Sequence, residues 1–146
     1  MKKYVLAYDL GTSGVKGALV TPEGDVAYTA TVSYPLYTAD GGIAEQDPSD
    51  YWRGVCSVTR AVLEKGDVAP EDVMGIALDT MWKGIIPIDK DGNVLHNCMI
   101  WLDARGEKQA KVLNELHTRH PKNQSKKYLT RSLKSTKFFL YMKNNI

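Results

Sequence analysis

The stretch AYDLGTSGVKGALV, residues 7–20, determines how the chain begins. Segments rich in β-forming residues lie on both sides of its glycines, at residues 4–10 and 15–21. A nucleoside-triphosphate P-loop requires G-x-x-x-x-G-K-[ST] before a helix, and a dinucleotide fingerprint requires G-x-G-x-x-G before a helix. Neither pattern is present, since the glycines occur as G-x-x-G-x-x-G and a strand follows them. The sequence therefore predicts two strands joined by a tight glycine turn.

The glycine turn also has the composition of a phosphate-binding site. Consecutive backbone N–H groups in a tight turn form a concavity that binds anions, and a glycine lets the backbone approach a ligand because it has no Cβ. Hydroxyl groups donate hydrogen bonds to phosphate oxygens, and a lysine ammonium adds a positive charge. The predicted phosphate-binding residues are Gly11, Thr12, Ser13 and Lys16, and Gly14 is expected to leave room for the ligand.

Asp9, at the end of the first strand, gives the turn a negative charge that would repel a bare phosphate. The carboxylate suits Mg²⁺ instead, because this ion commonly bridges a carboxylate, water and phosphate oxygens. The pattern thus predicts Asp9 near Mg²⁺, with contact through water. An ordinary hairpin turn capped by Asp9 explains the same residues without a ligand, and both interpretations stay open at this stage.

Strands and helices alternate after this hairpin, so the fold class is predicted as α/β. A third strand is followed by a helix that Asp47 caps, with Tyr51 and Trp52 expected in the core. A continuous apolar run then predicts a buried strand, and a further strand end leads into a second helix. The predicted elements occupy residues 26–37, 47–64, 73–81 and 99–116. The result is a mixed sheet that opens with an antiparallel meander of three strands.

The composition is that of a globular protein, with 43% hydrophobic and 25% charged residues among 146. The apolar run at the start contains Asp9 and lacks a small-residue cleavage site, so it predicts a strand and not a signal peptide. No apolar run reaches the ~20 residues that a membrane span requires. Cys56 and Cys98 lie in apolar segments and are expected to be free thiols, which favours a cytoplasmic protein.

The charge divides the chain into two parts. Residues 1–117 hold 11 Lys and Arg and all 17 Asp and Glu, a net charge of −6, whereas residues 118–146 hold 8 Lys and Arg and no acid. A division into a folded part, 1–117, and a basic tail, 118–146, is therefore expected. Such a tail has three explanations: native sequence that continues further, translation out of frame after about residue 117, or an arm that binds nucleic acid or another anionic surface. Binding to nucleic acid is the least favoured of the three, because charged runs commonly serve only to interact with solvent.

Several segments together resemble the FGGY family of carbohydrate kinases. The pattern D-x-G-T-S-x-x-K at Asp9 to Lys16 is similar to the first phosphate motif of the actin, hexokinase and sugar-kinase superfamily. GGIAEQDPSDYW, residues 41–52, resembles the E-Q-D-P segment of the FGGY family. MGIALDTMWKGIIPIDKDGNVLHNCMIWLDAR, residues 74–105, resembles that family's strand, hairpin and W-x-D-x-R segment in order and spacing. In the tail, STKFFLYMKNN faintly resembles the family's K-x-x-W-x-x-x-N helix.

The resemblance implies an ATP-dependent kinase that transfers the γ-phosphate to a hydroxyl of a sugar or polyol. It implies two ribonuclease-H-like domains of the actin-like ATPase type, of which this chain holds an incomplete first one. It also implies ATP and Mg²⁺ as cofactors, with Gly11, Thr12, Ser13 and Lys16 at the phosphates and Asp9 near Mg²⁺. By position, the resemblance places Trp82, Lys83, Trp101, Asp103 and Arg105 at the sugar.

These five residues have chemistry that suits a sugar, and each also has a structural explanation. An indole face fits the apolar C–H side of a sugar, while Asp and Arg direct hydrogen bonds to hydroxyls. Core packing would also explain Trp82, and a solvated strand end would explain Lys83. A structural corner would explain Trp101 and Asp103. Many pentulose kinases of the family read S-G-Q-M-H-G where this chain has DTMWKG, residues 79–84. This departure argues against xylulose and for another sugar or polyol.

The resemblance places the catalytic base, an Asp, near the end of the first domain and the adenosine pocket in the second. Both are expected beyond Ile146, so no catalytic residue is predicted in this chain. The isolated chain is expected to be an inactive fragment whose uncovered apolar faces favour self-association. Two alternatives remain: a non-catalytic remnant that binds sugar or nucleotide, and another member of the actin-like superfamily.

Overall fold

The computed structural model describes residues 3–119, and its elements divide into two compact units. Unit 1 comprises residues 3–36 and 47–82, and unit 2 comprises residues 37–46 and 83–119. The predicted tail lies outside the described residues, except for its first two. Among residues 3–119, no helix is long and apolar enough to cross a membrane.

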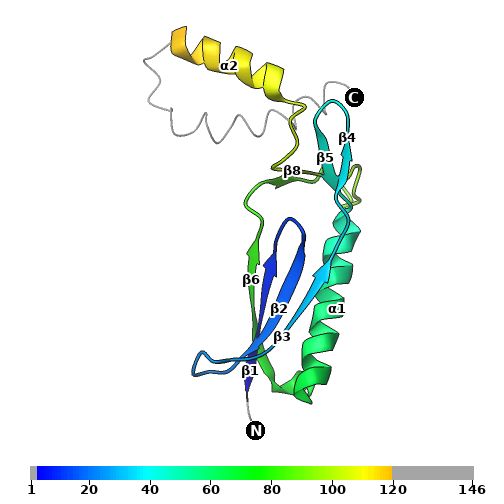
Figure 1. The fold of residues 1–146 in the computed structure, drawn as a ribbon, viewed down its shortest axis with the longest axis vertical. Coiled ribbons are helices and arrows are strands. Elements are labelled where there is room, and N and C mark those ends of the chain that lie inside the picture. The colour runs from blue at the N-terminus through cyan, green and yellow to red at the C-terminus, as the bar shows by residue number, and fades with distance from the viewer. Residues whose placement is uncertain (1–2, 120–146) are drawn as a thin grey trace. The chain divides into compact units, whose positions relative to one another are not determined.

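Unit 1 is a four-stranded sheet with one helix on it (Figure 1). The strands lie in the order β3-β2-β1-β6, where β1 pairs antiparallel with β2, β2 antiparallel with β3, and β1 parallel with β6. The sheet is therefore mixed, which agrees with the predicted α/β class. The elements are β1 (Tyr4–Leu10), β2 (Gly14–Val20), β3 (Val26–Ser33), α1 (Pro48–Gly66), the short 3₁₀ helix Pro70–Asp72 and β6 (Val73–Thr80).

Helix α1 begins where the sequence predicts. The Asp47 carboxylate accepts a hydrogen bond from the Ser49 backbone N–H at 2.8 Å, and Pro48 occupies the first turn. The helix ends at Asp67, whose φ of 48° and ψ of 47° are left-handed, and Val68 N–H donates to the Leu63 carbonyl. Local capping chemistry thus determines both ends of α1.

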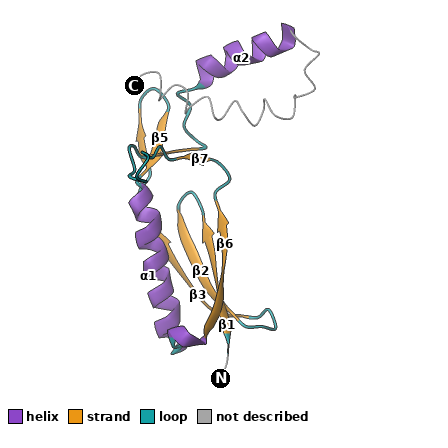
Figure 2. Ribbon diagram, turned by 180° about the vertical axis from the view of Figure 1, so that it is seen from behind, coloured by secondary structure: helices purple, strands orange, loops and turns teal. Residues whose placement is uncertain are grey.

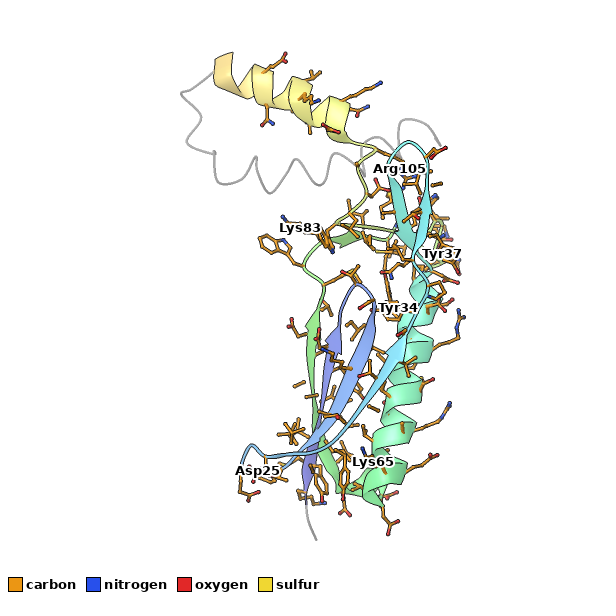
Figure 3. The ribbon with its side chains drawn as sticks, viewed as in Figure 1. Asp25, Tyr34, Tyr37, Lys65, Lys83 and Arg105 are labelled. Atoms are coloured by element: carbon orange, nitrogen blue, oxygen red, sulfur yellow. The ribbon has the colours of Figure 1, made fainter. Side chains whose placement is uncertain are left out.

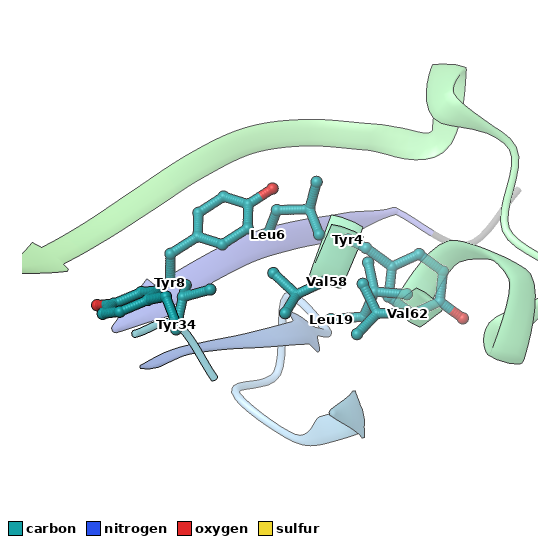
Figure 4. Packing of buried hydrophobic residues seen from close by; sticks show 8 residues of the cluster. Tyr4, Leu6, Tyr8, Leu19, Tyr34, Val58 and Val62 are labelled. Carbon is teal, nitrogen blue, oxygen red and sulfur yellow. The ribbon is translucent and has the colours of Figure 1, made fainter. Parts of the chain in front are cut away.

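The core of unit 1 lies between the sheet and α1 (Figures 2 and 4). Alternate residues of β1 and β2 point toward α1, as the two-residue period of a strand requires. Helix residues Val58 and Val62 are fully buried against them, and Tyr8 Oη lies 2.7 Å from Thr59 Oγ1. The buried cluster comprises Tyr4, Leu6, Tyr8, Val15, Leu19, Tyr34, Val58 and Val62.

Two expectations about burial in unit 1 are wrong. Trp52 is 70% exposed, because it lies about 200° around the helix from the buried Gly54 and faces solvent. Residues 73–81 do form a strand, but most of β6 is exposed, because it is the edge of the sheet and lies beyond the part that α1 covers. Tyr51 is partly buried and packs against Tyr34, with ring centroids 5.2 Å apart.

Unit 2 contains a second, smaller antiparallel sheet in the order β4-β5-β8-β7, and the helix α2. Its strands have only two to four residues each, and Cys98, Met99 and Ile100 of β8 are buried. A tight turn at residues 89–93 contains Gly92, whose φ is 86°. The elements are β4 (Tyr37–Ala39), β5 (Ile43–Gln46), β7 (Gly84–Ile85), β8 (Cys98–Ile100) and α2 (Glu107–Arg119). Neither Cys56 of unit 1 nor Cys98 takes part in a disulfide.

Candidate functional site

The glycine turn of unit 1 joins β1 to β2 and is closed by its own backbone. Gly11 N–H donates to the Gly14 carbonyl at 3.0 Å, and the Tyr34 hydroxyl donates to the Gly11 carbonyl. The Gly11 amide is therefore engaged within the turn and does not contribute to an anion-binding concavity. Ser13 is exposed, and Thr12 is half-buried.

A Cβ would make different contacts at each of the three glycines in this stretch. A Cβ at Gly14 would lie 2.4 Å from the Val32 carbonyl oxygen of the neighbouring strand, so this position requires glycine for strand packing. A Cβ at Gly17 would lie 2.9 Å from Val58 Cγ2 on α1. A Cβ at Gly11 would meet nothing closer than the Gly14 carbonyl at 3.5 Å, which is ordinary contact. Packing thus explains Gly14 and Gly17 and gives no reason for a glycine at position 11.

Asp9 and Lys16 lie beside each other on adjacent strands, because they are register partners in β1 and β2. Both side chains are exposed and point to the face opposite α1, since the buried Tyr8 precedes Asp9 on its strand. On the other side, Asp9 is the register partner of Asp79 in β6. The face thus carries the sequence Lys16, Asp9, Asp79 across three strands. Residue-by-residue reading missed Asp79, because only the strand register brings it beside Asp9.

Two carboxylates and phosphate oxygens are a donor set that Mg²⁺ accepts. Among residues 3–119, no group of three or more His, Cys, Asp or Glu side chains is arranged to hold a metal ion by itself. Asp9 and Asp79 are two carboxylates that could contribute to such a donor set, and the contact of Asp9 with Mg²⁺ stays a prediction. Trp82 ends unit 1 with 77% of its surface exposed, so core packing does not explain this residue.

Unit 2 has a partly buried ionic cluster around Arg105, a residue that Figure 3 labels. The Arg105 guanidinium donates to Asp103 Oδ2 from Nε at 2.9 Å and to Glu45 Oε1 from Nη2 at 2.5 Å. Burial disfavours the charge of Arg105, but the hydrogen bonds and charges of Asp103 and Glu45 outweigh this effect and raise its pKa above the ordinary value. His96 Nε2 lies 3.8 Å from the same Glu45 oxygen. The cluster fixes the guanidinium plane in one orientation.

The hydrogen bonds of Asp103 are those of a residue that stabilises the local structure. Its side chain is fully buried, Oδ2 accepts the backbone N–H of Ala44 at 3.1 Å, and Oδ1 accepts the backbone N–H of Arg105 at 3.2 Å. These bonds connect strand β5 to the turn after β8, which is the arrangement of a structural corner. Trp101 is half exposed, and Lys83 is half-buried.

In the segment Glu45–Pro48 the structure confirms Asp47 as the predicted helix cap and adds roles for Glu45 and Gln46. Glu45 binds Arg105, and Gln46 is fully buried and pairs with Cys98 across β5 and β8. Asp47 caps α1, and Pro48 begins it.

The sequence model of the FGGY family of carbohydrate kinases, N-terminal domain, matches residues 4–145. The chain belongs to this family. It is 33% identical over 113 residues to a xylulose kinase of Bacillus subtilis (strain 168), a match that covers 77% of this chain and 23% of that protein. The chain thus spans about a quarter of the length of the curated relatives it matches.

Solved kinase structures share the fold of this chain. The crystal structure of gluconate kinase from Lactobacillus acidophilus superposes with a TM-score of 0.74 at 22% identity, covering 80% of this chain and 23% of that one. Plasmodium falciparum glycerol kinase with ADP gives a TM-score of 0.66 at 16% identity, covering 77% of this chain and 23% of that one. The relatives are sugar or polyol kinases, and they differ in the substrates that their names give.

Proposed function

We propose that this chain is the N-terminal part of an ATP-dependent sugar or polyol kinase, and that its β1–β2 turn binds the phosphates of the nucleotide. The family match carries this proposal, and the β1–β2 turn is compatible with it, since a Cβ at Gly11 would meet nothing closer than the Gly14 carbonyl at 3.5 Å. The FGGY match and the shared fold support the same reaction class. The fold is accordingly proposed to be an incomplete ribonuclease-H-like domain of the actin-like ATPase superfamily.

The proposed roles in unit 1 follow from charge and position. Lys16, Thr12 and Ser13 hold the phosphate oxygens beside Gly11, and Asp9 holds water on a Mg²⁺ ion. ATP supplies the transferred phosphoryl group, and Mg²⁺ neutralises part of its charge. Lys16 partly offsets the negative charge of Asp9 and Asp79 on the same face, which would otherwise repel the nucleotide.

In unit 2, Trp101, Arg105 and Lys83 are proposed to contact the sugar, and the role of Trp82 in unit 1 stays a prediction of the family resemblance. The exposed indoles offer apolar faces to C–H groups, and Arg105 offers directed donors to hydroxyls. Asp103 is proposed to serve the sugar through Arg105, because its own oxygens accept hydrogen bonds from Ala44 and Arg105.

We further propose that the catalytic base and the adenosine pocket lie in sequence beyond residue 146. The 146-residue chain then binds phosphate without efficient turnover. The match of the family model through residue 145 favours native sequence over a shifted reading frame in the tail, and it requires no nucleic-acid partner. A cytoplasmic location is proposed from the free thiols of Cys56 and Cys98.

Titration with Mg²⁺-tripolyphosphate, followed by amide chemical shifts, tests the phosphate site without the adenosine pocket. The expected result is a saturable shift at residues 11–13 that Lys16→Ala abolishes. Lys90→Ala is the matched control, since this lysine is exposed in the turn of unit 2 and is expected to leave the shift unchanged. Equal loss in both variants, or no shift in the wild type, contradicts the proposed site.

A fluorescence titration with gluconate, xylulose and glycerol tests the sugar contacts. Trp82→Phe is expected to weaken the response to the substrate, whereas Trp52→Phe removes an equally exposed indole on α1 and is expected to leave the affinity unchanged. An assay of ADP release completes the test. Release that depends on both ATP and sugar, and is lost in Asp9→Asn, would overturn the proposal that the isolated chain lacks turnover.

A further inference from the structure

Tyr34 connects the end of strand β3 to the turn between β1 and β2. Gly14 of β2 is the register partner of Ser33, the last residue of β3, so Tyr34 lies next to the turn although 23 positions separate it from Gly11. Its hydroxyl donates to the Gly11 carbonyl. Only 8% of the Tyr34 surface is exposed, and all of these residues belong to unit 1. The hydrogen bond therefore lies within one compact unit.

Helix α1 holds the Tyr34 ring in place. The ring meets Tyr51 edge to face, with centroids 5.2 Å apart and planes at 72°. A Cβ built on Gly54, about one turn further along the helix, would lie 3.7 Å from Tyr34 Cδ1, so the ring also lies close to the helix backbone. Pro35 restricts the backbone of the preceding Tyr34 to extended conformations. Ring and backbone are thus both constrained within the buried cluster (Figure 4), which gives the hydroxyl a fixed position.

The peptide between Gly11 and Thr12 needs such a constraint, because it lies in a turn and follows a glycine. Glycine has more accessible backbone conformations than other residues, and a planar peptide rotates as a unit. The Gly11 N–H is held by the Gly14 carbonyl at 3.0 Å, and the Gly11 carbonyl is held by Tyr34. Both backbone polar groups of this glycine are therefore fixed, one of them by a side chain from outside the turn.

The same hydrogen bond determines which way the Gly11 carbonyl points. Tyr34 belongs to the apolar cluster between the sheet and α1, whereas the side chains of Asp9 and Lys16 lie on the opposite face. The carbonyl oxygen is thus directed to the helix side, away from the lysine. A carbonyl oxygen accepts hydrogen bonds and carries a partial negative charge, so in the opposite orientation it would repel phosphate, whereas backbone N–H groups attract it.

We infer that Tyr34 is a positioning residue for the phosphate site, because its hydroxyl holds the Gly11 carbonyl away from the bound phosphates. The inference rests on the proposed phosphate site at the β1–β2 turn and adds to it a residue that acts through the Gly11 peptide. Without the hydroxyl, this peptide populates both orientations. The apparent affinity for phosphate then falls with the fraction of molecules that keep the favourable orientation.

Titration of Tyr34→Phe with Mg²⁺-tripolyphosphate, followed by amide chemical shifts, tests the inference. The substitution removes the hydroxyl and retains the ring that packs on Tyr51. The affinity is expected to fall roughly two- to tenfold, since one hydrogen bond contributes a factor of that order. Tyr8→Phe is the matched control, because Tyr8 is also buried and its hydroxyl lies 2.7 Å from Thr59 Oγ1, on α1 and not in the turn. This control is expected to lose stability as Tyr34→Phe does and to keep the wild-type affinity.

The outcomes of this titration separate the inference from the proposed phosphate site. If wild type binds tripolyphosphate and Tyr34→Phe binds it equally well, or if both tyrosine variants lose affinity equally, the inference is wrong and the phosphate site stands. If wild type shows no saturable shift, the proposed site is wrong and the inference fails with it. A selective loss of affinity in Tyr34→Phe supports both.

Carbon-13 relaxation dispersion of the Gly11 carbonyl, measured without phosphate, tests the orientation of the peptide directly. Wild type and Tyr8→Phe are expected to show a single state. Tyr34→Phe is expected to show microsecond-to-millisecond exchange confined to residues 11 and 12. Equal behaviour of the three proteins would show that the carbonyl keeps its orientation without the Tyr34 hydroxyl, and would overturn the inference even where the titration shows that the turn binds phosphate.

Discussion

Val58 in unit 1 and Asp103 in unit 2 are both buried, but different interactions hold them. Val58 contacts a continuous apolar cluster between long strands and a helix. Asp103 accepts hydrogen bonds from backbone and guanidinium groups in a sheet of two- to four-residue strands. An apolar core tolerates imperfect contacts, because dispersion forces are not directional, whereas a buried polar cluster stabilises only when every member is satisfied. The two units should therefore respond differently to single substitutions.

The largest loss is expected for Asp103→Ala in unit 2. The substitution leaves Arg105 with one carboxylate partner and the buried Ala44 amide with none from this side chain, so unfolding should become about 3–5 kcal/mol easier. Hydrogen exchange at the Ala44 amide measures the effect directly. Asp91→Ala, in an exposed turn, is the control and should change stability by less than about 0.5 kcal/mol. A small effect of Asp103→Ala would show that unit 2 does not depend on the cluster.

Leu19→Ala is expected to have the next largest effect, and it tests the apolar unit. Leu19 is fully buried, and truncation of such a residue costs about 2–5 kcal/mol through lost transfer free energy and a residual cavity. Denaturant unfolding followed by Tyr fluorescence measures the loss, with the exposed Val26→Ala as control. If Leu19→Ala accelerated amide hydrogen exchange at Ala44 as much as in β1, the two units would unfold together. The contrast between the units would then be wrong.

Alanine at two glycines separates packing from ligand binding within unit 1. Gly14→Ala forces a Cβ to 2.4 Å from a backbone oxygen, so stability should fall by about 1–3 kcal/mol. Gly11→Ala meets only an ordinary 3.5 Å contact and should leave stability nearly unchanged while weakening tripolyphosphate binding. Thermal unfolding and the phosphate titration together distinguish the two. Equal destabilisation would remove the argument that the space beside Gly11 is for a ligand.

The smallest effect is expected for Asp47→Ala, which removes the cap of α1 at a cost of about 1 kcal/mol. Hydrogen bonds from the Ser49 side chain and backbone lower the pKa of Asp47 below its ordinary value of 3.8. The folded state therefore prefers the charged carboxylate. Its contribution is fully present above that ordinary value and disappears as the pH falls through the lower folded value. Urea unfolding at pH 7 and pH 2 should show wild type and variant converging in acid, and a constant difference would contradict the role of the charge.

The sequence predicted the elements that local chemistry determines. The alternation of β1 to β3 and the cap at Asp47 depend on neighbours within a few residues, and they occur as strands and as a helix start. Burial was predicted less well, since it depends on what covers a residue. Trp52 is exposed because it faces solvent on α1, and most of β6 is exposed because it lies beyond the part of the sheet that α1 covers.

In the candidate site, too, local sequence predicted some features, while others depend on contacts between distant residues. The stretch predicted to bind phosphate forms the predicted turn, because the signal for the turn lies within eight consecutive residues. Asp79 and Glu45 were missed as neighbours of Asp9 and Arg105, because strand register and a contact across 60 positions create those proximities. The predicted roles of the sugar-contacting residues await the titrations described above.

The segment Glu45–Pro48 has a consequence for searches by sequence motif. Its four residues end β5 and begin α1, and each is engaged in an ion pair, a buried position, a helix cap or a first turn. Selection for folding alone therefore suffices to preserve it. A chain that has lost phosphotransfer would retain this motif as long as it folds, so a motif search based on it retrieves the architecture and does not separate active kinases from inactive descendants.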